Sequence, residues 1–304
     1  MRSGLIAALA AVPLLGGGCS PPDRALPDVE PATVLEATPA VDISGTELAV
    51  PPDGRPYASP EGVELDVPYV PTPYPVVNAM LDMGQVDRGD YLMDLGSGDG
   101  RIAVEAGKRG ARAFGVDINP VRVEEAQKNA KAAGVSDRVT FKVQDLFQTP
   151  IRDATALTMY LLPDVNLKLR PRILDELKPG VRVVSHAFTM GDWEPDERRE
   201  VDGAQLMLWI VPAKVDGAWT LQGAGGGRLE LDQSYQKITG ALDGRPLRDA
   251  VLEGDRIQFV ADTAAGPRLF AGRVAGNAVM PAEPLRPAAG VQPAPGGWRL
   301  TRTG

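Results

Sequence analysis

The sequence predicts an α/β fold: a doubly wound domain followed by a small antiparallel all-β domain. Between residues 67 and 212, apolar runs of strand length alternate with stretches of helix length. A glycine-rich turn follows the first of these runs. Such alternation is typical of a parallel sheet with helices on both faces. After residue 212 the helical periods vanish and short alternating runs replace them, which indicates antiparallel strands.

The elements of the first domain follow one another at regular spacing. Pro120 stands where a helix tolerates proline, in its first turn, and Gly134 stands where a helix stops. Pro179-Gly180 breaks a later helix. Residues 205–211 are expected to be the last long strand of this sheet, and their pairing with residues 219–222 is left open. The other expected strands are residues 91–95, 113–116, 139–143, 154–160 and 181–185, and the expected helices are residues 101–108, 120–133 and 167–177.

Residues 213–304 are expected to form a small β-barrel or sandwich. Glycine-containing turns separate the runs. Residues 282–296 repeat Pro and Ala and read as a loop before the last strand. The segment contains no catalytic constellation, so it is either a docking or dimerising module or a passive cap. The expected strands are residues 228–231, 235–239, 256–260, 269–274 and 298–301.

Composition excludes several classes of protein. The chain has 304 residues, with 32 Lys and Arg against 40 Asp and Glu, a formal net charge of −8. That length suits two domains, and 43% hydrophobic residues exclude a wholly disordered chain. The acidic balance argues against a nucleic-acid partner, which needs a basic face. One cysteine excludes intramolecular disulfides, and with one histidine no metal site is expected.

The first 19 residues read as a targeting segment. Arg2 precedes an apolar run over residues 5–15, which is too short for the roughly 20 residues that cross a bilayer. Glycines directly before Cys19 resemble a bacterial lipobox, although Gly16 stands where leucine is usual. The resemblance implies lipidation of Cys19 and a membrane-anchored lipoprotein of the cell envelope. The alternatives are an ordinary signal peptide, or a misplaced start codon ahead of a cytoplasmic enzyme. Residues 20–66, rich in proline and acids, read as a tether.

The loop after the first strand indicates the ligand. Its sequence runs Asp94-Leu-Gly-Ser-Gly-Asp-Gly100, and its alternate glycines let the backbone turn tightly and approach a ligand. The loop has no lysine and the spacing of a P-loop is absent, so a phosphate is not expected. The carboxylates of Asp94 and Asp99 suit a ligand with a positive group. S-adenosylmethionine is such a ligand, with an ammonium, a sulfonium, a ribose and an adenine.

Two more carboxylates follow the next two strands. Asp117 closes the second strand, where an acid about 20 residues downstream accepts hydrogen bonds from ribose hydroxyls. Asp145 follows the third strand, where it would meet the adenine amino group. Any one of these residues is equally well explained as a helix cap, but the combination indicates a cofactor site. Its expected residues are Asp94, Gly96, Ser97, Gly98, Asp99, Gly100, Asp117, Ile118, Asp145 and Leu146.

These motifs resemble those of class I S-adenosylmethionine-dependent methyltransferases, over roughly residues 67–212, which implies a Rossmann-like domain. A narrower resemblance is to the protein-lysine methyltransferases that include the ATP synthase c-subunit enzyme. It implies a protein lysine as methyl acceptor, with Tyr69 and Thr72 closing over the methionine end of the cofactor. Many enzymes that methylate amide or exocyclic amino nitrogens carry Asp/Asn-Pro-Pro-Tyr where this chain has residues 160–163, which disfavours those acceptors. The narrower resemblance rests on Tyr69-Val-Pro-Thr-Pro73, the glycine loop through Ile102, Tyr160-Leu-Leu-Pro163 with Asn166, and Arg182-Val-Val-Ser-His186.

Methyl transfer asks little of acids and bases, because it is an in-line displacement in which positioning supplies most of the acceleration. A lysine must arrive neutral, which an apolar mouth or an acceptor such as Tyr160 favours. The candidate catalytic residues are Tyr160, Asn166 and His186; His186 is a possible base or, equally, a hydrogen-bonded strand-end histidine. Phe188 and Trp193 either line the mouth or pack in the core. The alternative functions are a small-molecule methyltransferase and a non-catalytic envelope lipoprotein that keeps the fold.

Overall fold

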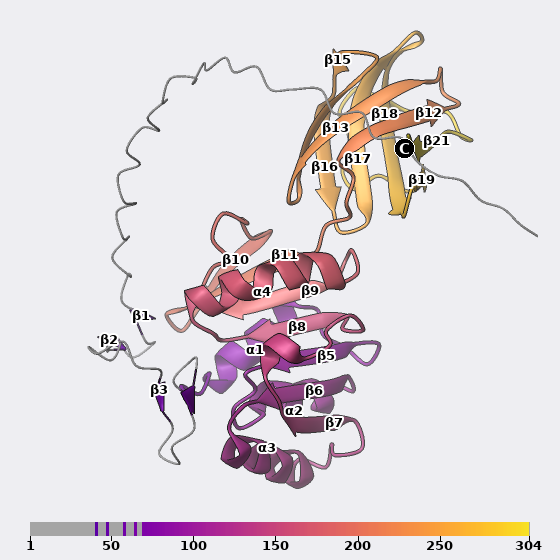
Figure 1. Ribbon diagram of the computed structural model, residues 1–304. Helices are drawn as coiled ribbons and strands as arrows, with labels where there is room; N and C mark the ends of the chain where they lie inside the picture. The colour runs from indigo at the N-terminus through magenta and orange to yellow at the C-terminus, as the bar shows by residue number, and fades with distance from the viewer. Residues whose placement is uncertain (1–39, 42–46, 49–56, 59–63, 66–68, 304) are drawn as a thin grey trace, which may run out of the picture. The chain divides into compact units, whose positions relative to one another are not determined.

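The computed structural model describes residues 40–41, 47–48, 57–58, 64–65 and 69–303 (Figure 1). The expected signal segment with Cys19 lies outside the described residues, as does most of the expected tether. Within the tether, the described residues are short strands that pair antiparallel, β1 with β2 and β3 with β4. No helix in the described ranges has the length and apolar character to cross a membrane. These strands are β1 (Ala40–Val41), β2 (Glu47–Leu48), β3 (Tyr57–Ala58) and β4 (Glu64–Leu65).

The described part of the first domain contains a seven-stranded sheet in the order β10-β11-β9-β8-β5-β6-β7. Strands β5 to β9 are parallel to one another, so the predicted doubly wound fold is confirmed. Because β5 has β6 on one side and β8 on the other, the strand order reverses there, and ligands bind at such a switch point. The parallel strands are β5 (Tyr91–Leu95), β6 (Arg112–Asp117), β7 (Val139–Val143), β8 (Ala156–Met159) and β9 (Arg182–His186).

The sheet is mixed rather than wholly parallel. Strand β11 (Ala204–Ile210) runs antiparallel between β9 and the edge strand β10 (Glu197–Val201). The expected strand over residues 205–211 is therefore confirmed, but its partners are β9 and β10. Residues 219–222 belong to the second sheet instead. The charged sequence of β10 suits an edge, where charges discourage pairing with another chain.

Helices cover both faces of this sheet, as Figure 1 shows. Three of them bury apolar side chains in one cluster: α1 (Tyr74–Met83), α2 (Arg101–Lys108) and α3 (Pro120–Ala132). The helix α4 (Pro163–Glu176) packs in the cluster on the other face. It begins four residues before the expected start, because Pro163 suits the first turn.

The second domain contains a ten-stranded antiparallel sheet in the described residues, with β20 joining β18 in parallel. Strand β14 also contacts β16 and β17, so the sheet curls toward a barrel. The predicted all-β fold is confirmed. Its core includes Trp219, Phe259, Phe270 and Trp298. The strands are β12 (Gly217–Gln222), β13 (Gly227–Ser234), β14 (Lys237–Leu242), β15 (Arg245–Pro246), β16 (Arg248–Glu253), β17 (Arg256–Thr263), β18 (Gly266–Ala275), β19 (Ala278–Pro281), β20 (Gln292–Pro293) and β21 (Arg299–Arg302).

Candidate active site

A pocket opens at the carboxyl ends of β5, β6, β7 and β8, beside the switch point. Its empty space, the open mouth included, is about 930 Å³. Residues 69–73 are here called the strap, and residues 69–72 of it form part of the wall. Gly100, Asn166 and His186, expected at the site, do not line the pocket. The expected residues that do line it are Tyr69, Thr72, Asp94, Gly96, Ser97, Gly98, Asp99, Asp117, Ile118, Asp145, Leu146 and Tyr160.

The glycine loop is folded against β6 and the strap. The N–H groups of Gly96 and Ser97 both donate to the Val116 carbonyl, at 2.9 and 2.8 Å. At Gly98, φ is +51° and an added Cβ would lie 2.5 Å from Cε2 of Tyr69, so only glycine lets the strap approach. Gly100 makes room elsewhere, since its added Cβ would lie 2.5 Å from the ring of Phe141. It is the N-cap of α2 and lets this helix start close to its neighbours.

Asp94 lies at the end of β5 and is buried. Thr158 donates a hydrogen bond of 2.8 Å to its Oδ1, while Oδ2 has no partner among the described residues. Burial raises the pKa of Asp94 to about 7; the Thr158 bond opposes this rise, and the nearby carboxylates of Asp117 and Asp99 add to it. A buried carboxyl with an unused oxygen at the pocket is suited to a ligand that brings a positive charge or a donor.

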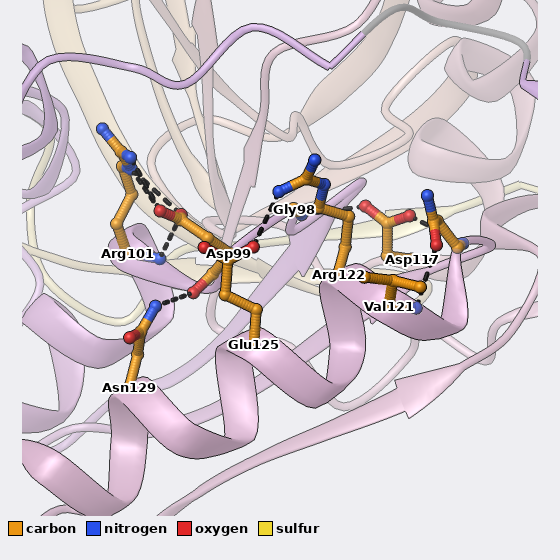
Figure 2. A network of polar contacts seen from close by, with 9 residues as sticks. Gly98, Asp99, Arg101, Asp117, Val121, Arg122, Glu125 and Asn129 are labelled. Atoms are coloured by element: carbon orange, nitrogen blue, oxygen red, sulfur yellow. Dashed lines mark hydrogen bonds and ion pairs between the residues drawn. The ribbon is translucent and has the colours of Figure 1, made fainter. Parts of the chain in front are cut away.

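Asp117, at the end of β6, braces the glycine loop. Its Oδ2 accepts from the Gly98 N–H at 2.8 Å and its Oδ1 from the Asn119 N–H at 2.9 Å (Figure 2). Burial raises the pKa of this carboxyl. The side chain that caps α3 is that of Asn119, which accepts from the Val121 N–H, so Asp117 is not the helix cap. Each carboxylate oxygen still has acceptor capacity for a ligand hydroxyl.

Asp145 combines both explanations that the sequence offers for it. Its Oδ1 accepts from the Phe147 N–H at 2.8 Å and so caps the short helix η1 (Leu146–Gln148). The residue also lines the pocket. Capping and ligand binding are therefore compatible at this position.

Two arginines of the lining, Arg101 and Arg122, were not expected from the sequence. Arg101 pairs with Asp99, with Nη2 and Oδ2 2.7 Å apart (Figure 2). Burial alone would raise the pKa of Asp99, but this guanidinium holds it below its usual value. Arg122 stacks over the Tyr69 ring at 4.0 Å and pairs with Glu125 at 2.7 Å. Both arginines lie in the first turn of a helix, where the helix dipole disfavours a cation, and this is the signal that points to them.

The aromatic rings of Tyr160, His186 and Phe188 lie together, and His186 is hydrogen-bonded to Thr72 of the strap. The centroid of the Tyr160 ring is 3.8 Å from that of His186 and 6.1 Å from that of Phe188. Buried Asn166 donates to the carbonyls of Phe188 and Thr189 at 3.2 and 3.3 Å, so it holds the segment after β9. Trp193 is buried in the core and its Nε1 donates to Gln236 at 2.9 Å.

The residues of the pocket fit S-adenosylmethionine. The buried unpaired oxygen of Asp94 suits its positive end, and Asp117 and Asp145 have acceptors for hydroxyl and amino groups. Both arginines of the lining are paired with carboxylates, so the wall presents no unpaired cation among the described residues. No group of three or more His, Cys, Asp or Glu residues that could hold a metal ion is found in the described ranges.

Comparison with known proteins identifies the family. Residues 94–197 match the family described as the ANTKMT methyltransferase domain. A protein-lysine N-methyltransferase of Saccharolobus islandicus (strain REY15A) is 44% identical over 142 residues, which are 46% of this chain and 88% of that protein. The chain belongs to this methyltransferase family. It is an S-adenosylmethionine-dependent methyltransferase.

Two further relatives match about half of the chain. The human lysine N-methyltransferase of the ATP synthase c-subunit is 30% identical over 154 residues, 51% of this chain and 66% of that protein. The crystal structure of an RNA methyltransferase from Salinibacter ruber in complex with S-adenosyl-L-homocysteine has 50% sequence identity and a TM-score of 0.47. It covers 48% of this chain and 96% of that chain.

Proposed function

We propose that this methyltransferase transfers the methyl group to a lysine side chain of a protein. The observation that supports this most strongly is the 44% identity to a protein-lysine N-methyltransferase, over nearly the whole length of that relative. The human relative in the same comparison also bears the name of a lysine methyltransferase. The net charge of −8 fits a basic protein segment better than a nucleic acid as partner.

The residues of the pocket support the proposal, because each part of the cofactor has a side chain of matching chemistry there. The methyl group comes from the sulfonium of bound S-adenosylmethionine. Asp94 would face its positive end, Asp117 its ribose and Asp145 its adenine. Tyr69 and Thr72 of the strap line the pocket, as does Tyr160, which directly follows β8.

The acceptor amine needs a neutral nitrogen, and the site offers a means to produce it. The rings of Tyr160 and Phe188 form an aromatic wall beside the pocket. Apolar surroundings disfavour an ammonium and lower its pKa, so the proton passes to water. His186 is a poor base for this step, because its burial lowers its pKa to about 4.

The test is to incubate the full chain with cell extract and S-adenosylmethionine labelled on its methyl group. Acid hydrolysis of the labelled protein should yield methylated lysine. The variant Asp117→Asn, which has lost a charge from the cofactor site, should leave the extract unlabelled. Label that only a nuclease releases, or that stays with small molecules, would refute the lysine proposal while leaving the enzyme class intact.

We also propose that the protein is anchored to a membrane of the cell envelope through lipid on Cys19. The support is the sequence pattern of residues 1–19, which lie outside the described residues. One lipid chain gives only reversible binding, whereas several chains at one cysteine give stable anchoring. Cell fractionation tests this. Wild-type protein should sediment with membranes and Cys19→Ser should not; soluble wild-type protein that retains Met1 would show a cytoplasmic enzyme instead.

A further inference from the structure

His186 is buried behind the wall of the pocket. It does not line the pocket, yet it contacts two residues that do. Its Nδ1 shares a hydrogen bond of 3.1 Å with the hydroxyl of Thr72 in the strap, and its ring lies against the ring of Tyr160. One side chain at the end of β9 thus contacts both the strap and Tyr160.

Burying this histidine costs free energy. Its side chain is fully enclosed, and its Nε2 has no partner among the described residues. A buried polar atom without a hydrogen bond costs free energy, so an apolar residue of similar size would pack there more favourably. The hydrogen bond to Thr72 is the contact that an apolar residue would lose. A role of that hydrogen bond at the site would explain why the protein keeps a histidine here in spite of the free energy that its burial costs.

Two arginines also hold the strap. Arg101 donates to the Thr72 carbonyl at 2.9 Å, and Arg122 stacks on the Tyr69 ring. Neither contact fixes the side chain of Thr72. The bond to His186 is the described contact that sets the direction of the Thr72 hydroxyl at the pocket.

We propose that His186 is a positioning residue, which orients Thr72 over the cofactor pocket and holds Tyr160 in register with it. It acts through these two residues and exchanges no proton with the acceptor. The inference needs only the cofactor site, not the identity of the acceptor. If the positioning role of His186 were refuted, the lysine proposal would therefore still hold. If the lysine proposal were refuted, the role of His186 would still hold.

Calorimetry of S-adenosylhomocysteine binding to the full chain tests the proposal. His186→Leu keeps the volume and removes the hydrogen bond, and Thr72→Val removes the hydroxyl. Each should weaken binding about three- to tenfold, the range of one neutral hydrogen bond. In the Thr72→Val background, His186→Leu should cost nothing more, because both changes break the same bond.

Two conservative variants separate positioning from packing. His186→Asn places a hydrogen-bonding atom near the position of Nδ1, and Thr72→Ser keeps the hydroxyl. Both variants should bind S-adenosylhomocysteine with an affinity within about twofold of the wild type. If His186 served only to pack the core, asparagine would not restore the binding that His186→Leu loses. Ser185→Ala is the matched control, because it removes a neighbouring buried hydroxyl that does not contact the strap. It should lower the melting temperature without changing the binding.

The outcomes against the proposal are distinct. Losses that multiply in the double variant would show that the two residues act separately. Unchanged binding in His186→Leu and in Thr72→Val would show that the bond does not serve the cofactor. A loss of label transfer of about 10²-fold or more in His186→Asn with normal binding would indicate a general base instead. If His186→Leu does not fold, Thr72→Val against Thr72→Ser still decides.

Discussion

The burial of Asp94 suits its carboxyl to a ligand but lowers the stability of the folded protein. Its pKa rises from 3.8 to about 7 because the fold buries it, so the folded state keeps a proton that the unfolded state has released. As the pH rises between these two values, the free energy of unfolding of the cofactor-free protein falls by roughly 1.4 kcal/mol per pH unit. Below pH 3.8 and above about pH 7 this contribution no longer changes with pH.

The variant Asp94→Asn should separate stability from binding. Asparagine can still accept from Thr158, and it removes the cost of burying a charge. We expect the cofactor-free variant to be more stable than the wild type at pH 8 but not at pH 4, and to bind S-adenosylhomocysteine more weakly. Urea denaturation at both pH values checks the first part. Equal stability differences at pH 4 and pH 8 would contradict the assigned ionisation.

Individual site residues were predictable where a short motif surrounds them. Asp94 and Asp117 lie at the ends of strands that the sequence shows, Gly98 lies in the loop after one of them, and strand ends meet at one edge of the sheet. The position of His186 was not predictable in the same way. Its partner Thr72 lies 114 residues away in the chain, and its burial depends on how the strap packs.

At the scale of elements, the glycine loop and the strap pack against each other in the wall of the pocket. Gly98 leaves the space that the Tyr69 ring fills, and Arg122 holds that ring from the other side. The positive φ of Gly98 also shapes the loop itself, so a substitution there acts in two ways. A control with the same backbone strain but no neighbour is needed to separate them.

Gly134 supplies that control, because its φ is +70° and an added Cβ would meet nothing within 4 Å. Both Gly98→Ala and Gly134→Ala should lose stability through backbone strain, about 1–2 kcal/mol each. Only Gly98→Ala should also weaken cofactor binding, by about tenfold or more, because its methyl group displaces Tyr69. Calorimetry and thermal unfolding of both variants check this. Equal binding by the two would mean that the strap does not close over the loop.

The elements that the sequence did not reveal have physical reasons for it. Helix α1 follows Pro71 and Pro73, has Pro75 in its first turn and contains adjacent valines, so its local preferences do not point to a helix. Strand β10 is almost wholly charged and exposed, and it exists because it pairs with β11. Helices α2 and α3 were predicted to within one residue, because Gly100, Pro120 and Gly134 mark their limits.

At the scale of the molecule, the cofactor pocket belongs to the first domain alone. Every residue that lines it falls between 69 and 161. The Saccharolobus islandicus relative matches 142 residues that make up 88% of its length, so it has no room for a second domain of this size. The fold classes of both domains were predictable from periodicity. The antiparallel end of the first sheet was not, because strand direction depends on distant pairing.

A chain that ends at residue 212 should therefore keep the cofactor site. We expect it to bind S-adenosylhomocysteine within about threefold of the full chain. Its melting temperature should be lower, because Trp193 loses the hydrogen bond to Gln236 and its ring contact with Tyr235. Calorimetry and circular dichroism measure both properties. A folded truncated chain that no longer binds would show that the β-domain completes the site.

Calorimetric titration of the full chain with S-adenosylmethionine tests the central claim most directly. We predict one binding site per chain, and a loss of about 10- to 150-fold in affinity for Asp117→Ala, since a charge-assisted hydrogen bond contributes about 1.5–3 kcal/mol. Asp262→Ala, at an exposed ion pair of the second sheet, should bind as the wild type does. A folded wild-type protein that gives no binding heat at millimolar ligand would contradict the account.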